Sequence, residues 1–180
     1  THVTALPVGA ASEKLDAELY DQFVGNSGFG SSDRATASMY APTSDATVIG
    51  TASFCPIDEL VNKLKLTNVD LIKLDIEGAE LEALKGAHKT LEQFNPFLTV
   101  EISTQLCANA QVDPKDIFSY LEQQNYEAFL IQHGPVTQSI SLNWKKRFGH
   151  LTSTNASSLP NFANILFCPA KKLNSLGLGI

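Results

Sequence analysis

The chain has 180 residues, of which 43% are hydrophobic and 18% are charged, and its formal net charge is −6. This size and composition fit one globular domain with a buried core, and no apolar run is long enough to span a bilayer. Binding to nucleic acid without sequence preference needs a basic stripe, and the nearest candidate, residues 144–147, is short. We therefore predict neither a nucleic-acid partner nor a membrane partner.

The three cysteines, Cys55, Cys107 and Cys168, lie far apart in the chain. They form no CxxC pair and no Cys/His spacing typical of zinc, so we expect small buried side chains in a reducing compartment. The N-terminus shows no basic region followed by an apolar one, so no signal peptide is visible. Both observations predict a cytoplasmic location. The first residue is not methionine, which indicates that the chain starts inside a longer product or was processed.

The first third of the chain predicts short strands followed by a helix. Residues 3–8 and 47–54 are expected to be short strands, and residues 18–20 one arm of a hairpin. Residues 25–36 are rich in glycine and serine and predict a loop. Pro56 begins a helix at the position where its missing N–H costs nothing, and apolar residues then recur at helical spacing.

The middle of the chain alternates between strands and helices. An almost continuous apolar run over residues 69–74 predicts a central strand that is buried on both faces, as in a parallel sheet. A helix is expected from about Ala79 to Leu91, and Pro96 prevents its continuation. Residues 97–101 predict the next strand, which ends in an acid.

The same alternation continues to the end of the chain. Asp113 and Pro114 begin a helix, and residues 126–131 and 163–168 predict two further strands. A long polar loop separates these two strands. The alternation of strands and helices predicts an α/β domain.

Three carboxylates, Asp75, Glu77 and Glu80, directly follow the apolar run, with Gly78 among them. Ligands bind at the carboxyl ends of strands in open α/β sheets, and a glycine lets the backbone approach a ligand closely. Acids this close together repel one another, so at least one of their pKa values should be raised. Two alternatives stay open: Glu77 or Glu80 caps a helix, or the acids hold a divalent cation through oxygen.

The order of the motifs resembles that of the FkbM-type methyltransferases. The resemblance rests mainly on Lys73-Leu-Asp-Ile-Glu-Gly-Ala-Glu80, followed by Leu84-Lys-Gly-Ala87 and Pro96-Phe-Leu-Thr-Val-Glu101. It implies transfer of a methyl group from S-adenosylmethionine. It also implies a Rossmann-like class I methyltransferase sheet, mostly parallel, with helices on both faces and the strand order 3-2-1-4-5-7-6.

The resemblance also assigns site residues. The segment Ala5-Leu-Pro-Val-Gly-Ala10 is similar to the third strand of the family and the turn after it. Val8, Gly9 and Ala10 would then border the adenine of the cofactor, and Asp75 would lie near the reacting methyl group. Glu77 and Glu80 would position or deprotonate the acceptor hydroxyl, as a general base does. No metal ligand is implied.

One departure from the family is larger than any substitution. The first strand and the glycine-rich loop, which hold the methionine end of the cofactor, are absent, and so is the second strand. We therefore expect residues 1–180 to form a single methyltransferase-like domain that lacks its first strands. Residues 3–8 would then be separated from residues 69–74 by two empty places in the sheet. The chain by itself should bind the cofactor weakly or not at all, which leaves its activity in isolation open.

The sequence thus predicts an S-adenosylmethionine-dependent methyltransferase that acts on a hydroxyl of a sugar, polyketide or other small metabolite. The alternative is a non-catalytic methyltransferase-like remnant that acts as an interaction module. Two other residues lie outside the acidic motif: His133 after a strand is either a base or substrate contact or simply solvated, and Trp144 beside a lysine either forms part of an acceptor pocket or covers the core. His150 is placed in the loop rich in serine, threonine and asparagine at residues 151–158, which is either a substrate-specificity loop or simply mobile.

Overall fold

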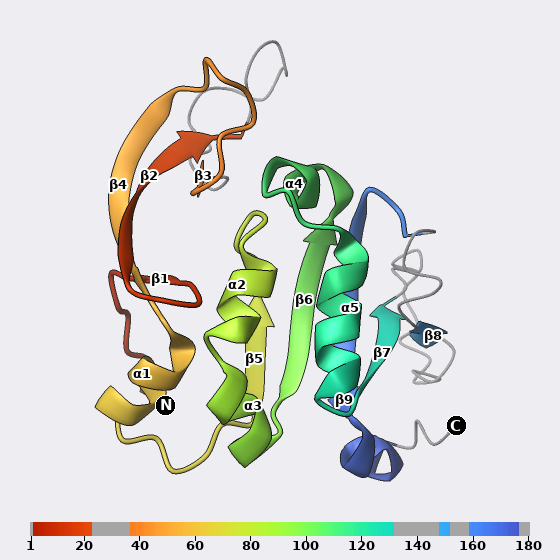
Figure 1. Cartoon of the computed structure of the whole chain (residues 1–180). Helices are drawn as coiled ribbons and strands as arrows, with labels where there is room; N and C mark the ends of the chain where they lie inside the picture. Colours follow the sequence, from red (N-terminus) through yellow and green to blue (C-terminus); the bar gives the residue numbers. More distant parts are fainter. Residues whose placement is uncertain (1, 23–36, 132–147, 152–158, 177–180) are drawn as a thin grey trace, which may run out of the picture.

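The structure is a computed structural model, and it describes residues 2–22, 37–131, 148–151 and 159–176. These residues form a mixed α/β arrangement with two separate β-sheets (Figure 1). The first, here called the hairpin sheet, has the strand order β1-β4-β2-β3. Its strands are β1 (Gly9–Ala10), β2 (Leu15–Asp21), β3 (Ala37–Ser38) and β4 (Val48–Cys55).

The second sheet, here called the core sheet, has the order β5-β6-β9-β7-β8. Its strands are β5 (Leu71–Leu74), β6 (Phe97–Ser103), β7 (Tyr126–Ile131), β8 (Phe148–Leu151) and β9 (Phe162–Pro169). β5 runs parallel to β6, whereas the other pairings in this sheet are antiparallel. The expectation of a mostly parallel sheet is therefore wrong, because β9 inserts between β6 and β7 and runs against both.

The strand that delivers the acids is not central. Among the described residues, β5 pairs with β6 alone and so lies at the edge of the core sheet. Leu71 at its start is 56% exposed, whereas Leu74 at its end is 3% exposed. The apolar run of residues 69–74 is therefore buried on one face only, which corrects the prediction of burial on both.

Short helices connect the strands and cover the core sheet. They are α1 (Ile57–Lys63), α2 (Glu80–Lys85), α3 (His88–Phe94), α4 (Thr104–Asn109), α5 (Pro114–Gln123) and the 3₁₀ helix η4 (Ala170–Leu176). Helices α2, α3 and α5 all lie on one face of the core sheet (Figure 1). On the opposite face, the described residues place only η4 against the strands, where Leu173 packs against the buried pair Phe129 and Cys168.

The helix predicted from Ala79 to Leu91 is two helices, α2 and α3. A remote side chain explains the break, because Asp58 of α1 accepts hydrogen bonds from the backbone N–H groups of Lys89 (3.0 Å) and Thr90 (2.8 Å). These bonds satisfy the free donors at the start of α3. The start of α5 agrees with prediction, since the Asp113 side chain accepts from the N–H of Lys115 at 2.9 Å.

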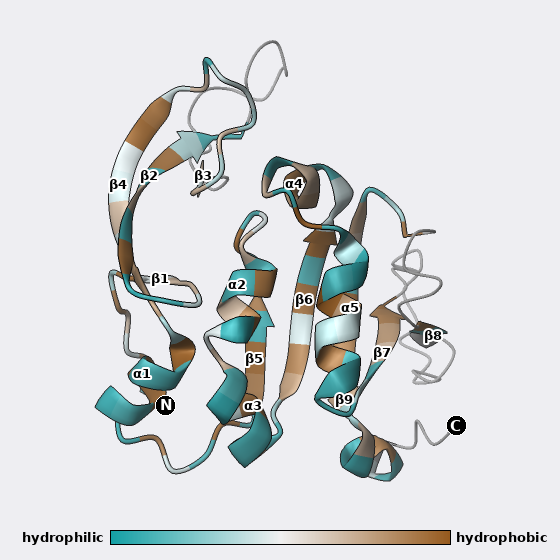
Figure 2. Ribbon diagram, in the orientation of Figure 1, coloured by the Kyte–Doolittle hydropathy of each residue, from teal (hydrophilic) through white to brown (hydrophobic). Residues whose placement is uncertain are grey.

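The hydrophobic core lies between the core sheet and these three helices. The strand residues Leu98, Val100, Ile102 and Ile165 are 0% exposed. Phe118 of α5 packs against Phe167 of β9 with ring centroids 5.3 Å apart. Figure 2 shows the matching pattern, with hydrophobic residues along β6 and hydrophilic residues on the outer side of the helices.

The N-terminal segment departs from the predicted strand. Residues 3–8 are not in a strand, and the first strand pairing involves Gly9 and Ala10, which lie parallel to Phe54 and Cys55 of β4. Residues 18–20 lie in a strand as predicted, and β2 pairs antiparallel with β4 over most of its length and with β3 at its end.

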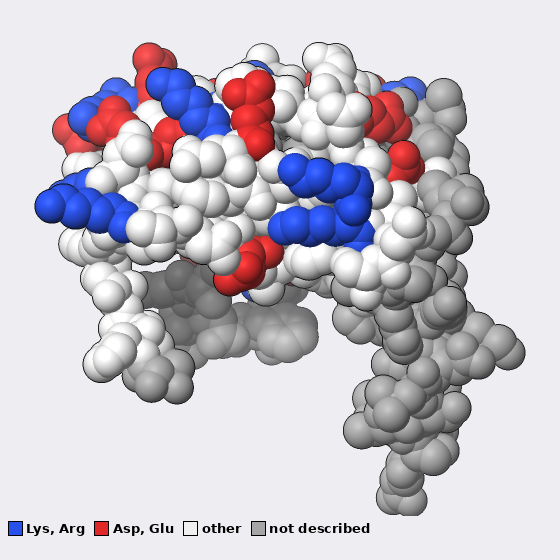
Figure 3. All heavy atoms as spheres, turned by 90° about the horizontal axis from the view of Figure 1, so that it is seen from below, with Lys and Arg blue, Asp and Glu red and all other residues white. Residues whose placement is uncertain are grey.

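Seen from below, acidic and basic side chains are interspersed over the surface (Figure 3).

Candidate functional site

The turn between β5 and α2 has an unusual backbone that brings its acids together. Glu77 and Gly78 both have positive φ angles, of 57° and 104°. A side chain on Gly78 would place its Cβ 2.8 Å from the carbonyl oxygen of Leu106 in α4. Glycine at position 78 is thus required by both conformation and space, and it lets the turn lie against α4.

The buried side chain of Glu80 forms hydrogen bonds with the backbone of this turn. Its side chain is only 3% exposed, and Oε1 accepts hydrogen bonds from the N–H groups of Ile76 (3.1 Å) and Gly78 (3.3 Å). Burial raises the pKa of Glu80, and the backbone hydrogen bonds oppose that rise. This geometry favours a structural role for Glu80 in the turn, and its predicted role toward an acceptor stays a prediction.

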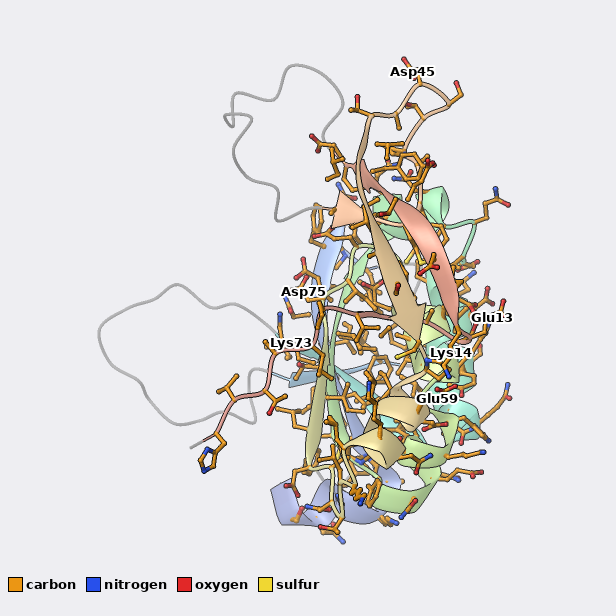
Figure 4. The ribbon with its side chains drawn as sticks, turned by 90° about the vertical axis from the view of Figure 1, so that its left-hand side faces the viewer. Glu13, Lys14, Asp45, Glu59, Lys73 and Asp75 are labelled. Carbon is orange, nitrogen blue, oxygen red and sulfur yellow. The ribbon has the colours of Figure 1, made fainter. Side chains whose placement is uncertain are left out.

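Asp75 lies at the carboxyl end of β5, next to an acid of the neighbouring strand. Because Leu74 pairs with Val100 in the parallel register, the next residues, Asp75 and Glu101, lie side by side. Lys73 forms an ion pair with Asp75, with 2.5 Å between Nζ and Oδ2. Figure 4 shows Lys73 and Asp75 together near the strand end, well away from Lys14 and Glu59.

The electrostatics of the cluster agree with the prediction of a raised pKa. Burial raises the pKa of Glu77, and the charges of Asp75, Glu101 and Glu80 raise it further. Burial and the neighbouring Asp75 likewise raise the pKa of Glu101. Burial is the largest single cause in both cases, so partial exclusion from water raises these two pKa values more than any one neighbouring charge does.

Two of the residues assigned to the cofactor share a cavity with two of the acids. This cavity has a volume of about 250 Å³ and lies between the hairpin sheet and the turn. Its lining residues are Gly9, Ala10, Leu19, Ala37, Met39, Ala52, Phe54, Asp75, Ile76, Glu77 and Ala79. A narrow pocket beside it is lined by Asp75, Glu77, Glu80, Glu101, Ser103 and Leu106. The structure therefore places Gly9, Ala10, Asp75 and Glu77 around one space.

Val8 is not part of that space. It lines a separate cavity of about 590 Å³, which is bounded by the segment before β1, by β2 and β4, and by α1. An ion pair between Lys14 and Glu59 lies at this larger cavity, with 2.5 Å between Nζ and Oε2 (Figure 4). The three consecutive residues assigned to adenine thus face two different cavities.

Polar contacts attach the hairpin sheet and the residues beside it to the turn after β5 and to helices α2 and α4. The hydroxyl of Ser38 in β3 donates to the carbonyl of Glu77 at 2.6 Å, and Ser38 is 2% exposed. The side-chain amide of Asn109 in α4 donates to Gln22 at 3.1 Å. Ser12 donates to Glu82 of α2. These contacts hold the wall that faces the acids.

Sequence reasoning missed several residues of the site. Glu101 carried a usable signal, because it ends a strand that was predicted to neighbour the strand of Asp75. Ser38, Met39 and Phe54 carried none, since they reach the cavity through the folding of the hairpin sheet.

The other candidate residues lie elsewhere. His150 is in β8 and pairs with Glu127, with 2.8 Å between Nε2 and Oε2, at the edge of the core sheet opposite to β5. His133 and Trp144 lie outside the described residues. Cys107 and Cys168 are buried, and burial raises their pKa values to about 12 and about 11, so both stay protonated at neutral pH.

Two further observations concern the described part of the chain. It contains no group of three or more histidine, cysteine, aspartate or glutamate side chains arranged to hold a metal ion. Within the same residues, every helix is too short or too polar to cross a membrane.

The fold and the site together define an α/β domain with an acid-lined cavity at the carboxyl end of a strand. The family profile described as "Methyltransferase FkbM domain" matches residues 7–128. The chain belongs to this methyltransferase family, as its motifs predicted. The matched segment includes both walls of the 250 Å³ cavity.

A curated relative supports the same family. The chain is 41% identical over 66 residues to the hexuronic acid methyltransferase AglP of Haloferax volcanii. That stretch is 37% of this chain and 25% of the relative, so the chain matches about a quarter of the relative's length. No solved structure matches the chain significantly.

Proposed function

We propose that this chain forms the acceptor side of an S-adenosylmethionine-dependent methyltransferase that acts on a hydroxyl of a sugar, polyketide or other small metabolite. The observation that carries the proposal is the shared cavity. Gly9 and Ala10, which the family resemblance assigns to the cofactor, face the same 250 Å³ space as Asp75 and Glu77. Membership of the FkbM methyltransferase family supports the reaction type.

The strand order supports a Rossmann-like class I arrangement. The order β5-β6-β9-β7, with β9 antiparallel to both neighbours, corresponds to strands 4-5-7-6 of that class. On this assignment the acids follow strand 4, at the sheet edge where α/β enzymes bind ligands. The exposed edge of β5 is then the place where strand 1 of the class would pair.

The residues of the cavity suit S-adenosylmethionine, which supplies an electrophilic methyl group on a positively charged sulfur. The apolar part of the lining, with Ala10, Ala52 and Phe54, suits the purine. Asp75 and Glu77 at the other end place negative charge on that side of the cavity, which suits a sulfonium, and the partial burial of Glu77 strengthens its attraction for a cation. The side chains therefore match both the apolar and the cationic parts of the cofactor.

Glu77 is the best placed of the three predicted acids to receive a proton from an acceptor hydroxyl. It lines both the 250 Å³ cavity and the narrow pocket, and burial raises its pKa toward the range in which a carboxylate accepts protons efficiently. Asp75 and Glu101 can accept hydrogen bonds from neighbouring hydroxyls of a polyol. The hexuronic acid methyltransferase relative supports a sugar as the acceptor.

The test is methyl transfer by the whole protein that contains this chain, with labelled S-adenosylmethionine and a panel of neutral and acidic oligosaccharides. We expect labelled product with at least one sugar, and a loss of about 10²–10⁴-fold for Glu77→Gln if Glu77 takes the proton. Asp75→Ala should abolish turnover. Glu59→Gln, in the exposed ion pair with Lys14, is the matched control and should keep full activity.

Two outcomes would contradict the proposal. A protein that binds neither S-adenosylmethionine nor its product would support the non-catalytic remnant. Full activity in both Asp75→Ala and Glu77→Gln would remove the acids from the reaction. The predicted cytoplasmic location stays a prediction that cell fractionation can test.

A further inference from the structure

The aromatic ring of Phe54 occupies an unusual position between the two cavities. Phe54 lines both the 250 Å³ and the 590 Å³ cavity, and no other aromatic side chain of the described residues lines either one. It lies at the end of β4, directly opposite Gly9 of β1. The ring thus forms part of the wall that separates the two spaces.

Gly9 makes this ring position possible. A Cβ atom on Gly9 would lie 2.3 Å from two ring carbons of Phe54, closer than real Cβ atoms come to any neighbour. The ring therefore lies where the side chain of residue 9 would otherwise be. Any larger residue at position 9 would push the ring out of its place.

The rest of the 250 Å³ cavity is an apolar slot that ends at two acids. Ala10, Ala37 and Ala52 offer small walls, and Met39 contributes a polarisable thioether. Small walls leave room for a flat ligand, and an aromatic ring at the side binds a flat π-system by stacking. A saturated or highly hydroxylated group would leave the ring and the alanines without a matching surface.

We propose that Phe54 is the stacking platform for the purine base of the methyl donor, and that Gly9 is glycine so that this ring can lie across it. The inference rests on the proposed function, since it assumes an adenosine-containing cofactor. It assigns the purine to the 250 Å³ cavity, on the side of Ala10 and Met39. The larger cavity beside Val8 then stays outside the purine site.

Titration of the full 180-residue chain with adenosine, followed by NMR, tests the proposal. Adenosine carries the purine without the methionine end, and NMR detects binding even at millimolar affinity. We expect shifts at Gly9, Ala10 and Met39, and nuclear Overhauser effects from the adenosine H2 or H8 proton to the Phe54 ring. Uridine, which has a smaller ring, should bind more weakly.

The variants separate stacking from simple filling of space. Phe54→Leu keeps an apolar side chain but removes the ring, and should weaken adenosine binding about fivefold or more. Phe54→Tyr keeps the ring and should stay within about twofold of wild type. Gly9→Ala should weaken binding as Phe54→Leu does. Phe162→Leu is the matched control, because Phe162 is 62% exposed on β9 and lines neither cavity.

Several results would overturn the proposal. These are the absence of adenosine shifts in the wild-type chain, unchanged affinity in Phe54→Leu, or shifts centred on Lys14 and Lys63 of the larger cavity. The nuclear Overhauser measurement needs no variant, so it decides the question even if a variant fails to fold.

Failure of this inference can be told apart from failure of the proposed function. Adenosine that stacks on Phe54 in a protein without methyl transfer contradicts the proposed function alone. Methyl transfer in a protein whose Phe54→Leu variant binds adenosine normally contradicts the stacking role alone.

Discussion

The core sheet and the hairpin sheet bury their side chains to very different extents. Leu98, Val100 and Ile102 of the core sheet are 0% exposed, and helices cover that face. In the hairpin sheet, the first four residues of β4 are all exposed, and Ile49 is 38% exposed. Among the described residues from 2 to 55, only Ala11 and Ser38 are buried. Burial of apolar surface therefore stabilises one sheet far more than the other.

The candidate site lies where these two regions meet. One wall of the 250 Å³ cavity comes from the hairpin sheet and the other from the turn after β5. The two walls are joined by polar contacts such as the hydrogen bond from Ser38 to Glu77. Each polar contact contributes little compared with a buried core residue. The shape of the site thus depends on a weakly held wall placed against a strongly held one.

The largest loss of stability is expected for a substitution in the hydrophobic core. Phe118→Ala removes a 0% exposed ring that packs on Phe167 and should lower the free energy of unfolding by about 3–5 kcal/mol. Ile49→Ala, on the exposed face of β4, should change it by less than about 0.5 kcal/mol. Denaturant unfolding measures both. Equal losses would mean that the hairpin sheet buries more than its exposure indicates.

The next largest loss of stability is expected for a substitution in the turn between β5 and α2. Gly78→Ala places a Cβ at a φ of 104° and 2.8 Å from the Leu106 carbonyl, and should cost about 1–3 kcal/mol. The strain should also displace Glu77 and lower methyl transfer in the whole protein. Gly50→Ala is the matched control, because a Cβ there meets nothing within 4 Å. A Gly78→Ala variant with wild-type stability would show that the turn relaxes freely.

Loss of the contact between the two walls of the cavity should lower stability by a smaller amount. Ser38→Ala removes the donor to the Glu77 carbonyl and should lower the free energy of unfolding by about 0.5–1.5 kcal/mol. Hydrogen exchange should become faster in β3 and at the turn, and stay unchanged in β6. Ser53→Ala, which loses an exposed hydrogen bond to Asp16, should have almost no effect. Unchanged exchange in β3 would mean that other contacts hold this wall.

The smallest expected effects concern how the free energy of unfolding changes with pH. The pKa of Glu80 is raised above its usual value of 4.5 by burial, so the folded state holds its proton more tightly than the unfolded state. Its contribution is full below the usual pKa and is lost as pH rises through the raised value. Glu80→Gln should therefore flatten the decline of the unfolding free energy as pH rises from the usual pKa to the raised one.

Glu82, on the same helix, should change the pH dependence of stability in the opposite direction. Hydrogen bonds from Lys85 and Ser12 lower the pKa of Glu82, so its contribution is present above its usual pKa and is lost as pH falls. Glu82→Gln should reduce the loss of stability at acid pH. Chemical unfolding at a series of pH values measures both variants, and equal slopes for both would contradict the assigned environments.

Local patterns in the sequence predicted most of the elements. The hairpin arm around Glu18, the strands at residues 97–101 and 126–131, and the start of α5 at Asp113 all depend on neighbours in the chain. Mistakes arose where a distant residue decided the outcome. Asp58 divides the predicted long helix in two, and the pairing of β9 with β6 and β7 makes the core sheet mixed.

The sequence by itself determined the family of this protein and the acids at the end of β5. Both depend mainly on the contiguous stretch of residues 73–80, whose members lie close together in space because they are neighbours along the chain. Only the tertiary structure decided that β5 is an edge strand, that Glu101 stands beside Asp75, and that Phe54 lies across Gly9. Those relations join segments far apart in the chain, and no local pattern encodes which distant side chains will share a cavity.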